Sequence, residues 1–109
     1  VYTATKAAIE AFTASLAFEL EAFDLRVKLV EPGYCPSTAF AANGGARMAG
    51  LLPAPYAPLA ARLFAGLDQP TVFTREADVA DAIWRAATDT SGTLRFPAGA
   101  DAIALARSA

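Results

Sequence analysis

The sequence predicts an α/β fold with parallel strands, and two observations support that prediction. A long stretch without glycine or proline, residues 1–23, leads into a short apolar run that ends at a Pro-Gly pair. The same change from a helix-like to a strand-like pattern recurs between residues 75 and 99. The predicted order is helix, strand, loop with a short helix, helix, strand, helix. A chain of 109 residues is within the usual size of one domain, so residues 1–109 are assigned to one domain.

The first predicted helix covers residues 1–23, in which Ala, Leu, Glu and Phe dominate. Its apolar side chains lie nearly all round the helix axis, which predicts burial on two sides, by a sheet and by something else. Asp24 tolerates the left-handed turn that ends such a helix. The stretch 25–33 then predicts a buried strand that delivers the Pro32–Gly33 turn.

Residues 36–72 are predicted to be irregular, because an Asn-Gly-Gly triplet and three prolines interrupt them. One short helix is expected at 56–66. We interpret this long segment as a mobile lid or substrate loop, with a plain surface linker as the alternative.

A second clear helix is predicted at 75–88, with Thr74 as its N-cap and acidic residues in its first turn. Trp84 has apolar neighbours on this helix, so we expect it in the core. A short strand within 92–99 and a terminal helix at 100–109 complete the predicted order.

Composition argues against several classes of function. The net charge is −2 and no cluster of Lys and Arg occurs, which argues against a nucleic-acid partner. No run of about 20 apolar residues and no signal-peptide pattern is present, so no membrane association is expected. The single cysteine fits a reducing, cytoplasmic location. With no histidine, a zinc site or a Ser-His-Asp triad within this chain is not expected, and acid–base chemistry would use Tyr, Lys, Asp or Glu.

Tyr2 and Lys6 are the residues best placed for such chemistry, because a spacing of four puts both on one helix face. A tyrosine with its ordinary pKa of about 10 is a poor catalyst at neutral pH. A neighbouring ammonium favours the phenolate, and such a tyrosine can exchange a proton with an alcohol or alkoxide. The pair alone is weakly specific, because many helices carry a packed tyrosine and a solvated lysine at this spacing.

The stretch YTATKAAIEAFTASLAFELEAFDLRVKLVEPG resembles the short-chain dehydrogenase/reductase family over its whole length. That family shows Y-x-x-x-K opening a long helix, then a turn, then a strand ending in V-x-P-G. The final stretch, LRFPAGADAIALARSA, is also similar to the end of one branch of the family. The resemblance implies the C-terminal half of a Rossmann-like doubly wound parallel sheet, and a chain that is the C-terminal part of a longer NAD(P)-binding domain.

The resemblance also implies roles for single residues. Tyr2 corresponds to the catalytic acid/base, and Lys6 to the residue that binds the nicotinamide ribose and activates the tyrosine. Pro32 and Gly33 correspond to the turn beside the nicotinamide. The implied reaction moves a hydride between NAD or NADP and a small carbonyl or alcohol substrate, with the choice of cofactor left open.

After Pro-Gly the family often places a threonine that contacts the nicotinamide carboxamide. Here Ser37 has the usual offset and Thr38 follows it, so either residue is a candidate. Pro36 departs from the family pattern and removes a backbone N–H group. Tyr34 and Cys35 are expected to line the substrate pocket, with Cys35 as a small packed side chain rather than a nucleophile.

Two alternatives stay open, the first because the sequence lacks the family's glycine-rich phosphate turn and its catalytic serine, and because its first helix is apolar nearly all round. The first is a catalytically inert, truncated module with a structural or interaction role. The second is an epimerase or dehydratase that uses the same Tyr-Lys pair on nucleotide sugars. The resemblance also implies that the helix at 1–23 forms a homodimer or homotetramer contact, which agrees with its lack of a polar face.

Overall fold

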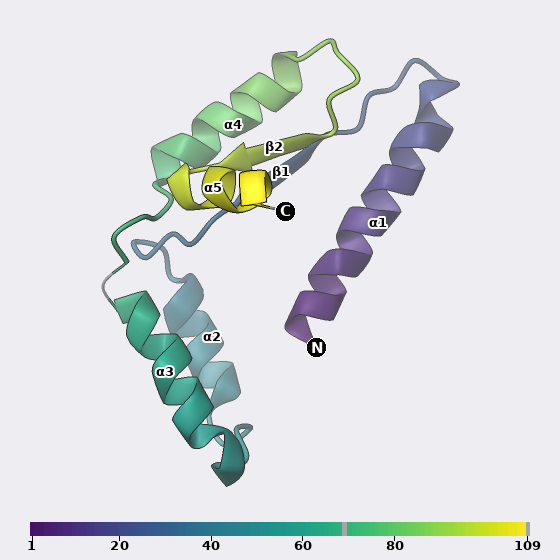
Figure 1. Ribbon diagram of the computed structural model, residues 1–109. Helices are drawn as coiled ribbons and strands as arrows, with labels where there is room; N and C mark the ends of the chain where they lie inside the picture. Colours follow the sequence, from purple (N-terminus) through teal and green to yellow (C-terminus); the bar gives the residue numbers. More distant parts are fainter. Residues whose placement is uncertain (69, 109) are drawn as a thin grey trace.

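The computed structural model describes residues 1–68 and 70–108. Figure 1 shows two short strands with helices around them and a pair of helices that extends away from the strands. The helices are α1 (Tyr2–Glu21), α2 (Phe40–Met48), α3 (Ala57–Asp68), α4 (Glu76–Thr88) and α5 (Ala100–Ser108). The strands are β1 (Leu29–Pro32) and β2 (Arg95–Ala98), and a 3₁₀ turn, η1 (Ala54–Tyr56), precedes α3.

The two strands pair in parallel, with Leu29 opposite Arg95 and Pro32 opposite Ala98. Parallel neighbours need a long crossover, and here the crossover contains α2, α3 and α4. The prediction of an α/β fold with parallel strands is therefore confirmed.

The small core lies where α4 packs against the strands. Ala82 and Ala86 of α4 are buried, as are Phe96 and Ala98 of β2. Alanine has the smallest side chain that still favours a helix, so α4 can approach the strands closely. In Figure 1 the strands lie between α4 and α1, and α5 lies next to β2.

Lys28 joins the chain just before β1 to the turn that leads into β2. Its ammonium donates to Asp89 Oδ1 at 2.7 Å and to the carbonyls of Ser91 and Thr93, each at 2.8 Å. The hydrogen bond from Lys28 is the main cause that lowers the pKa of Asp89 below its ordinary value. All three N–H groups of the ammonium are thus used to align the two strands at their starts.

The helices predicted at 1–23 and 75–88 and the two predicted strands are confirmed with shorter bounds. The strands expected within 25–33 and 92–99 are 29–32 and 95–98. The left-handed turn expected at Asp24 is also confirmed, since its φ is 55°. The terminal helix reaches Ser108, and residue 109 of the predicted helix lies outside the described residues.

Outside the helix expected at 56–66, the prediction that residues 36–72 are irregular is wrong for α2. The Asn43–Gly45 triplet lies inside α2, because the alanines and other helix formers around it outweigh glycine's cost of about 1 kcal/mol each. Pro55 and Pro58 lie in the first turns of η1 and α3, where a missing N–H group breaks no intrahelical bond. The helix expected at 56–66 is confirmed as α3, and residue 69 lies outside the described residues.

Two burial predictions and one capping prediction are wrong. None of the residues of α1 is buried, although burial on two sides was expected, and the Phe18 side chain is 81% exposed. Trp84, expected in the core, is 68% exposed because α4 turns its alanines to the strands instead. Arg75, not Thr74, is the N-cap of α4, and its N–H donates to the Asp78 carboxylate at 2.8 Å. No described helix has the length and apolar character needed to cross a membrane.

Candidate functional site

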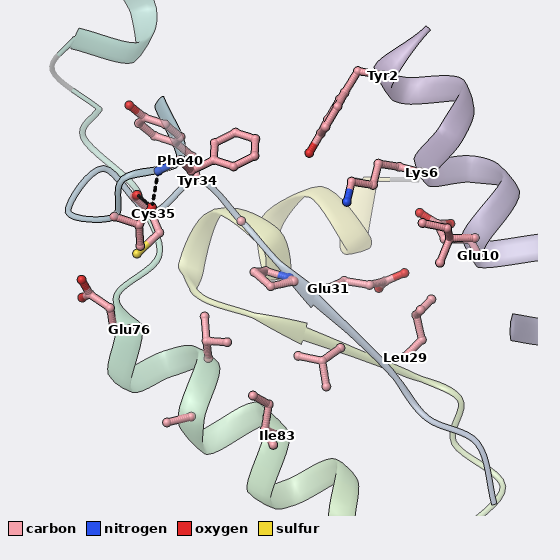
Figure 2. A pocket seen from close by; sticks show the side chains of 17 residues that line it. Tyr2, Lys6, Glu10, Leu29, Glu31, Tyr34, Cys35, Phe40, Glu76 and Ile83 are labelled. Atoms are coloured by element: carbon pink, nitrogen blue, oxygen red, sulfur yellow. Dashed lines mark hydrogen bonds between the residues drawn. The ribbon is translucent and has the colours of Figure 1, made fainter. Parts of the chain in front are cut away.

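A cleft of about 790 Å³ runs along β1 between α1 and the first half of α4. Figure 2 shows side chains from both helices and from the turn after β1 around it. Seven of the eight predicted site residues line this cleft: Tyr2, Lys6, Pro32, Gly33, Tyr34, Cys35 and Thr38. The structure therefore brings the two ends of the predicted motif together in space.

The Tyr2 and Lys6 side chains point from α1 into the cleft (Figure 2). The Lys6 Nζ atom lies 5.4 Å from the centroid of the Tyr2 ring, which is within cation–π range. On its other side the Tyr2 ring lies 6.2 Å from the ring of Phe40, the first residue of α2. Tyr2 lines the cleft and remains 59% exposed.

The backbone of the turn after β1 is held by hydrogen bonds to other backbone groups and to one side chain. Gly33 donates its N–H to the Ala98 carbonyl at 3.1 Å, which extends the β1–β2 pairing by one step. Tyr34 donates its N–H to Asp101 Oδ2 at 2.7 Å and accepts from the Thr74 N–H at 2.8 Å. The carboxyl ends of parallel strands are where α/β folds bind ligands, so this turn lies at the expected place for a site.

Ser37 and Thr38 differ in what their hydroxyls contact. Ser37 donates to Glu76 Oε1 at 2.6 Å, and this hydrogen bond is the main cause that lowers the pKa of Glu76. Thr38 donates to the Cys35 carbonyl at 2.8 Å and lines the cleft, which Ser37 does not. The Cys35 side chain is half-buried, with its Sγ 3.6 Å from Ser37 Oγ. Which hydroxyl contacts a ligand stays a prediction.

The comparisons with known proteins agree with this arrangement. The model of the short chain dehydrogenase family matches residues 1–48, a stretch that contains α1, β1 and the turn after it. Two uncharacterized oxidoreductases of Schizosaccharomyces pombe (strain 972 / ATCC 24843) are each 35% identical to the chain over 100 residues. These matches support membership of the short-chain dehydrogenase family.

The match to each fission-yeast relative covers 91% of this chain and 41% of the relative. The chain thus spans about two fifths of the length of these two relatives. No solved structure matches the chain. Two parallel strands with helices around them are consistent with part of the Rossmann-like fold that the family resemblance implied.

The cleft residues fit the nicotinamide end of the family's cofactor by their chemistry. A phenol, an ammonium and a hydroxyl (Tyr2, Lys6 and Thr38) can bond to ribose hydroxyls and a carboxamide. Leu29 and Val30 of β1 add apolar surface against which a flat ring can pack. For the pyrophosphate, the sequence has no G-x-G-x-x-G pattern.

Three charged residues of this region were not predicted from the sequence. Arg95 of β2 donates from Nη1 to Glu31 Oε1 at 2.5 Å and to Glu10 Oε2 at 3.0 Å. Glu31 first and Glu10 second raise the pKa of Arg95 above its ordinary value. The contact ties α1 to both strands. In the sequence, the one indication of a charged contact here was Glu10, which lies one helical turn after Lys6 on the same helix face.

The cleft has one cation among its carboxylates. Of the described residues that line it, Lys6 alone carries a positive charge. Glu10 and Glu31 share Arg95, and Glu76 accepts from Ser37, so each carboxylate already has a partner. The Lys6 ammonium lies next to the Tyr2 ring and is placed to attract a negatively charged or polar group that enters the cleft.

Proposed function

We propose that the protein containing this chain is an oxidoreductase that transfers a hydride between NAD(P)(H) and a carbonyl or alcohol substrate. The single observation that carries the proposal is the meeting of Tyr2 and Lys6 with the Pro32–Gly33 turn around one cleft. Family membership supports the same activity, since the two relatives are themselves named as oxidoreductases.

In this proposal Tyr2 moves the proton. Its hydroxyl gives a proton to the oxygen that becomes an alcohol during reduction, or takes one from an alcohol during oxidation. The Lys6 ammonium, close to the ring, would activate Tyr2 by stabilising negative charge that develops on its oxygen, and would bind the ribose hydroxyls. The nicotinamide, when bound, supplies or accepts the hydride.

The other predicted residues orient the reactants. The Pro32–Gly33 turn would border the nicotinamide, with Ser37 or Thr38 as the donor to its carboxamide. Tyr34 and Cys35, which line the cleft, would contact the substrate. We propose NAD or NADP without preference, because the residue that distinguishes their riboses belongs to the nucleotide-binding half of the fold.

Replacing Tyr2 by Phe in the full-length protein tests the proposal, because the change removes only the hydroxyl. We expect kcat to fall by about 100-fold or more, the usual contribution of a general acid–base group. Tyr56→Phe is the matched control, since Tyr56 is also exposed but does not line the cleft. Turnover of the Tyr2→Phe protein near that of the wild type would contradict the assigned role.

A catalytically inert module is the second candidate, and the exposed apolar surface of α1 favours it. It predicts that the full-length protein binds no nicotinamide cofactor. An epimerase or dehydratase ranks lower. It would consume its substrate while the absorbance of reduced nicotinamide stays constant over many turnovers. We further propose a cytoplasmic protein that forms a homodimer or homotetramer through α1.

A further inference from the structure

Five residues meet beneath the turn after β1, and we call them the Asp101 cluster: Gly33, Tyr34, Thr74, Gly99 and Asp101. They come from the end of β1, the segment before α4, the end of β2 and the first turn of α5. The Thr74 side chain is the largest that is fully buried in the described part of the chain. Of the three polar members, only Tyr34 was among the predicted site residues. Thr74 and Asp101 had no assigned functional role.

Hydrogen bonds fix the Tyr34 backbone from two sides. Asp101 accepts the Tyr34 N–H at Oδ2, at 2.7 Å, and the Thr74 hydroxyl at Oδ1, at 2.6 Å. The same hydroxyl lies 2.9 Å from the Ala98 carbonyl, so its one proton is shared between two acceptors. The Thr74 N–H donates to the Tyr34 carbonyl at 2.8 Å. Both polar groups of the Tyr34 backbone therefore depend on this cluster.

Both glycines of the cluster are required by their neighbours. A Cβ atom at Gly33 would clash with the Asp101 carboxylate. A Cβ atom at Gly99 would clash with the Thr74 side chain, and the φ of Gly99 is 96°, which glycine adopts most readily. The side chains of Thr74 and Asp101 thus occupy the space directly behind the turn.

The carboxylate of Asp101 is kept charged in spite of its surroundings. Burial is the largest influence and acts to raise its pKa. Hydrogen bonds from the Thr74 hydroxyl, from the Tyr34 N–H and from the N–H groups at the start of α5 outweigh it, so the pKa lies below the ordinary value. An ionised carboxylate accepts hydrogen bonds only, which matches its two donors.

We propose that Thr74 and Asp101 are positioning residues, which hold the Gly33–Tyr34 backbone at the cleft so that the nicotinamide and the substrate meet Tyr2 correctly. This inference rests on the proposed function, because the turn matters only if a ligand binds beside it. It makes the first turn of α5 part of the site, although α5 itself does not line the cleft.

The test compares Asp101→Leu with Asp101→Asn in the full-length protein. Leucine has a similar size and no acceptor, so the Tyr34 N–H loses its partner. Asparagine can accept that N–H and donate to Thr74, whose hydroxyl then donates to Ala98. We expect Asp101→Leu to raise the cofactor KM about tenfold or more, whereas Asp101→Asn stays within about threefold of the wild type.

Amide hydrogen exchange is the second readout and needs no activity. Exchange in residues 33–35 should become about tenfold faster in Asp101→Leu and stay near the wild-type rate in Asp101→Asn. A purely structural role predicts less folded enzyme with an unchanged KM and unchanged local exchange. That result, or equal damage from both variants, overturns the proposal.

A second pair of variants covers the case in which Asp101→Leu does not fold. Thr74→Val removes the hydroxyl and Thr74→Ser keeps it, so only Thr74→Val should raise the KM and speed the local exchange. If both behave alike, the proposal is wrong. The Tyr2→Phe experiment separates this outcome from failure of the proposed function, because the exchange result stands whether or not Tyr2 is catalytic.

Discussion

At the scale of the residue, the site combines one reactive pair with a rigid turn. Tyr2 and Lys6 are exposed side chains of α1, so their position depends on where α1 lies. Gly33 and Tyr34 are held by hydrogen bonds to α5 and to the segment before α4. The exposed Tyr2 and Lys6 side chains therefore face a backbone that hydrogen bonds hold in place.

Asp101 makes the stability of this region depend on pH. Its pKa is lower in the folded chain than the value of about 3.9 expected when unfolded. Its contribution is therefore present above that value and is lost as the pH falls through the folded pKa. We expect the urea midpoint to drop less between about pH 6 and pH 3 in Asp101→Asn than in the wild type.

Asp24→Asn is the matched control for this measurement. Asp24 is an exposed carboxyl in a left-handed turn that asparagine also tolerates. The control should keep the acid dependence of the wild type. An Asp101→Asn variant with the same acid dependence as the wild type would show that Asp101 carries none of it.

At the scale of the element, local pattern predicted the helices and strands near the motif well and the middle of the chain poorly. Residues 1–23 and 75–88 have long periodic patterns, and both formed helices with nearly the expected bounds. The α2 stretch was missed because two adjacent glycines are read as a break, although a helix of good formers can absorb them. Whether α2 and α3 form the predicted lid is still a prediction.

The outward face of α1 is the element on which the proposed assembly depends. Phe18 lies on the side of the helix away from Tyr2, as helical geometry requires, and is 81% exposed. We expect Phe18→Ser to weaken the homodimer or homotetramer of the full-length protein, because a buried Phe contributes strongly to an interface. Sedimentation velocity over a range of concentrations measures the change.

The control for this assembly experiment is Trp84→Ser, which removes an exposed aromatic residue from α4 instead of α1. Full-length protein that sediments as a monomer before any substitution would contradict the proposed contact. So would a Phe18→Ser protein whose dissociation is no greater than that of the control.

At the scale of the whole molecule, the chain is extended and its sheet is small. The principal dimensions are 51 × 26 × 26 Å, and the few buried side chains lie around α4 and β2. β1 pairs with β2 on one edge, and its other edge lies along the cleft. Parallel sheets are normally covered on both faces. Here β1 has a free edge in the described part of the chain and α1 is exposed, so much apolar surface remains in contact with water.

This openness predicts that the 109 residues alone have no measurable NAD(P)H turnover. Only the nicotinamide end of the cofactor finds donors around the described cleft, and the sequence has no glycine-rich phosphate turn. Assays of the isolated chain with NADH, with NADPH and with a panel of small carbonyls measure this directly. Robust oxidation of either cofactor would refute the prediction. We also expect the isolated chain to aggregate, which light scattering detects.

The α/β class, the outer helices and the residues Tyr2, Lys6, Pro32 and Gly33 were all accessible from the sequence. Each depends on local spacing, since four positions set a helix face and a Pro-Gly pair ends a strand. Their meeting in one cleft, the bonds of Arg95 to Glu10 and Glu31, and the Asp101 cluster were not accessible in this way. Asp101 and Tyr34 lie 67 positions apart, and only packing of α5 beside β2 brings such distant polar groups within hydrogen-bonding distance.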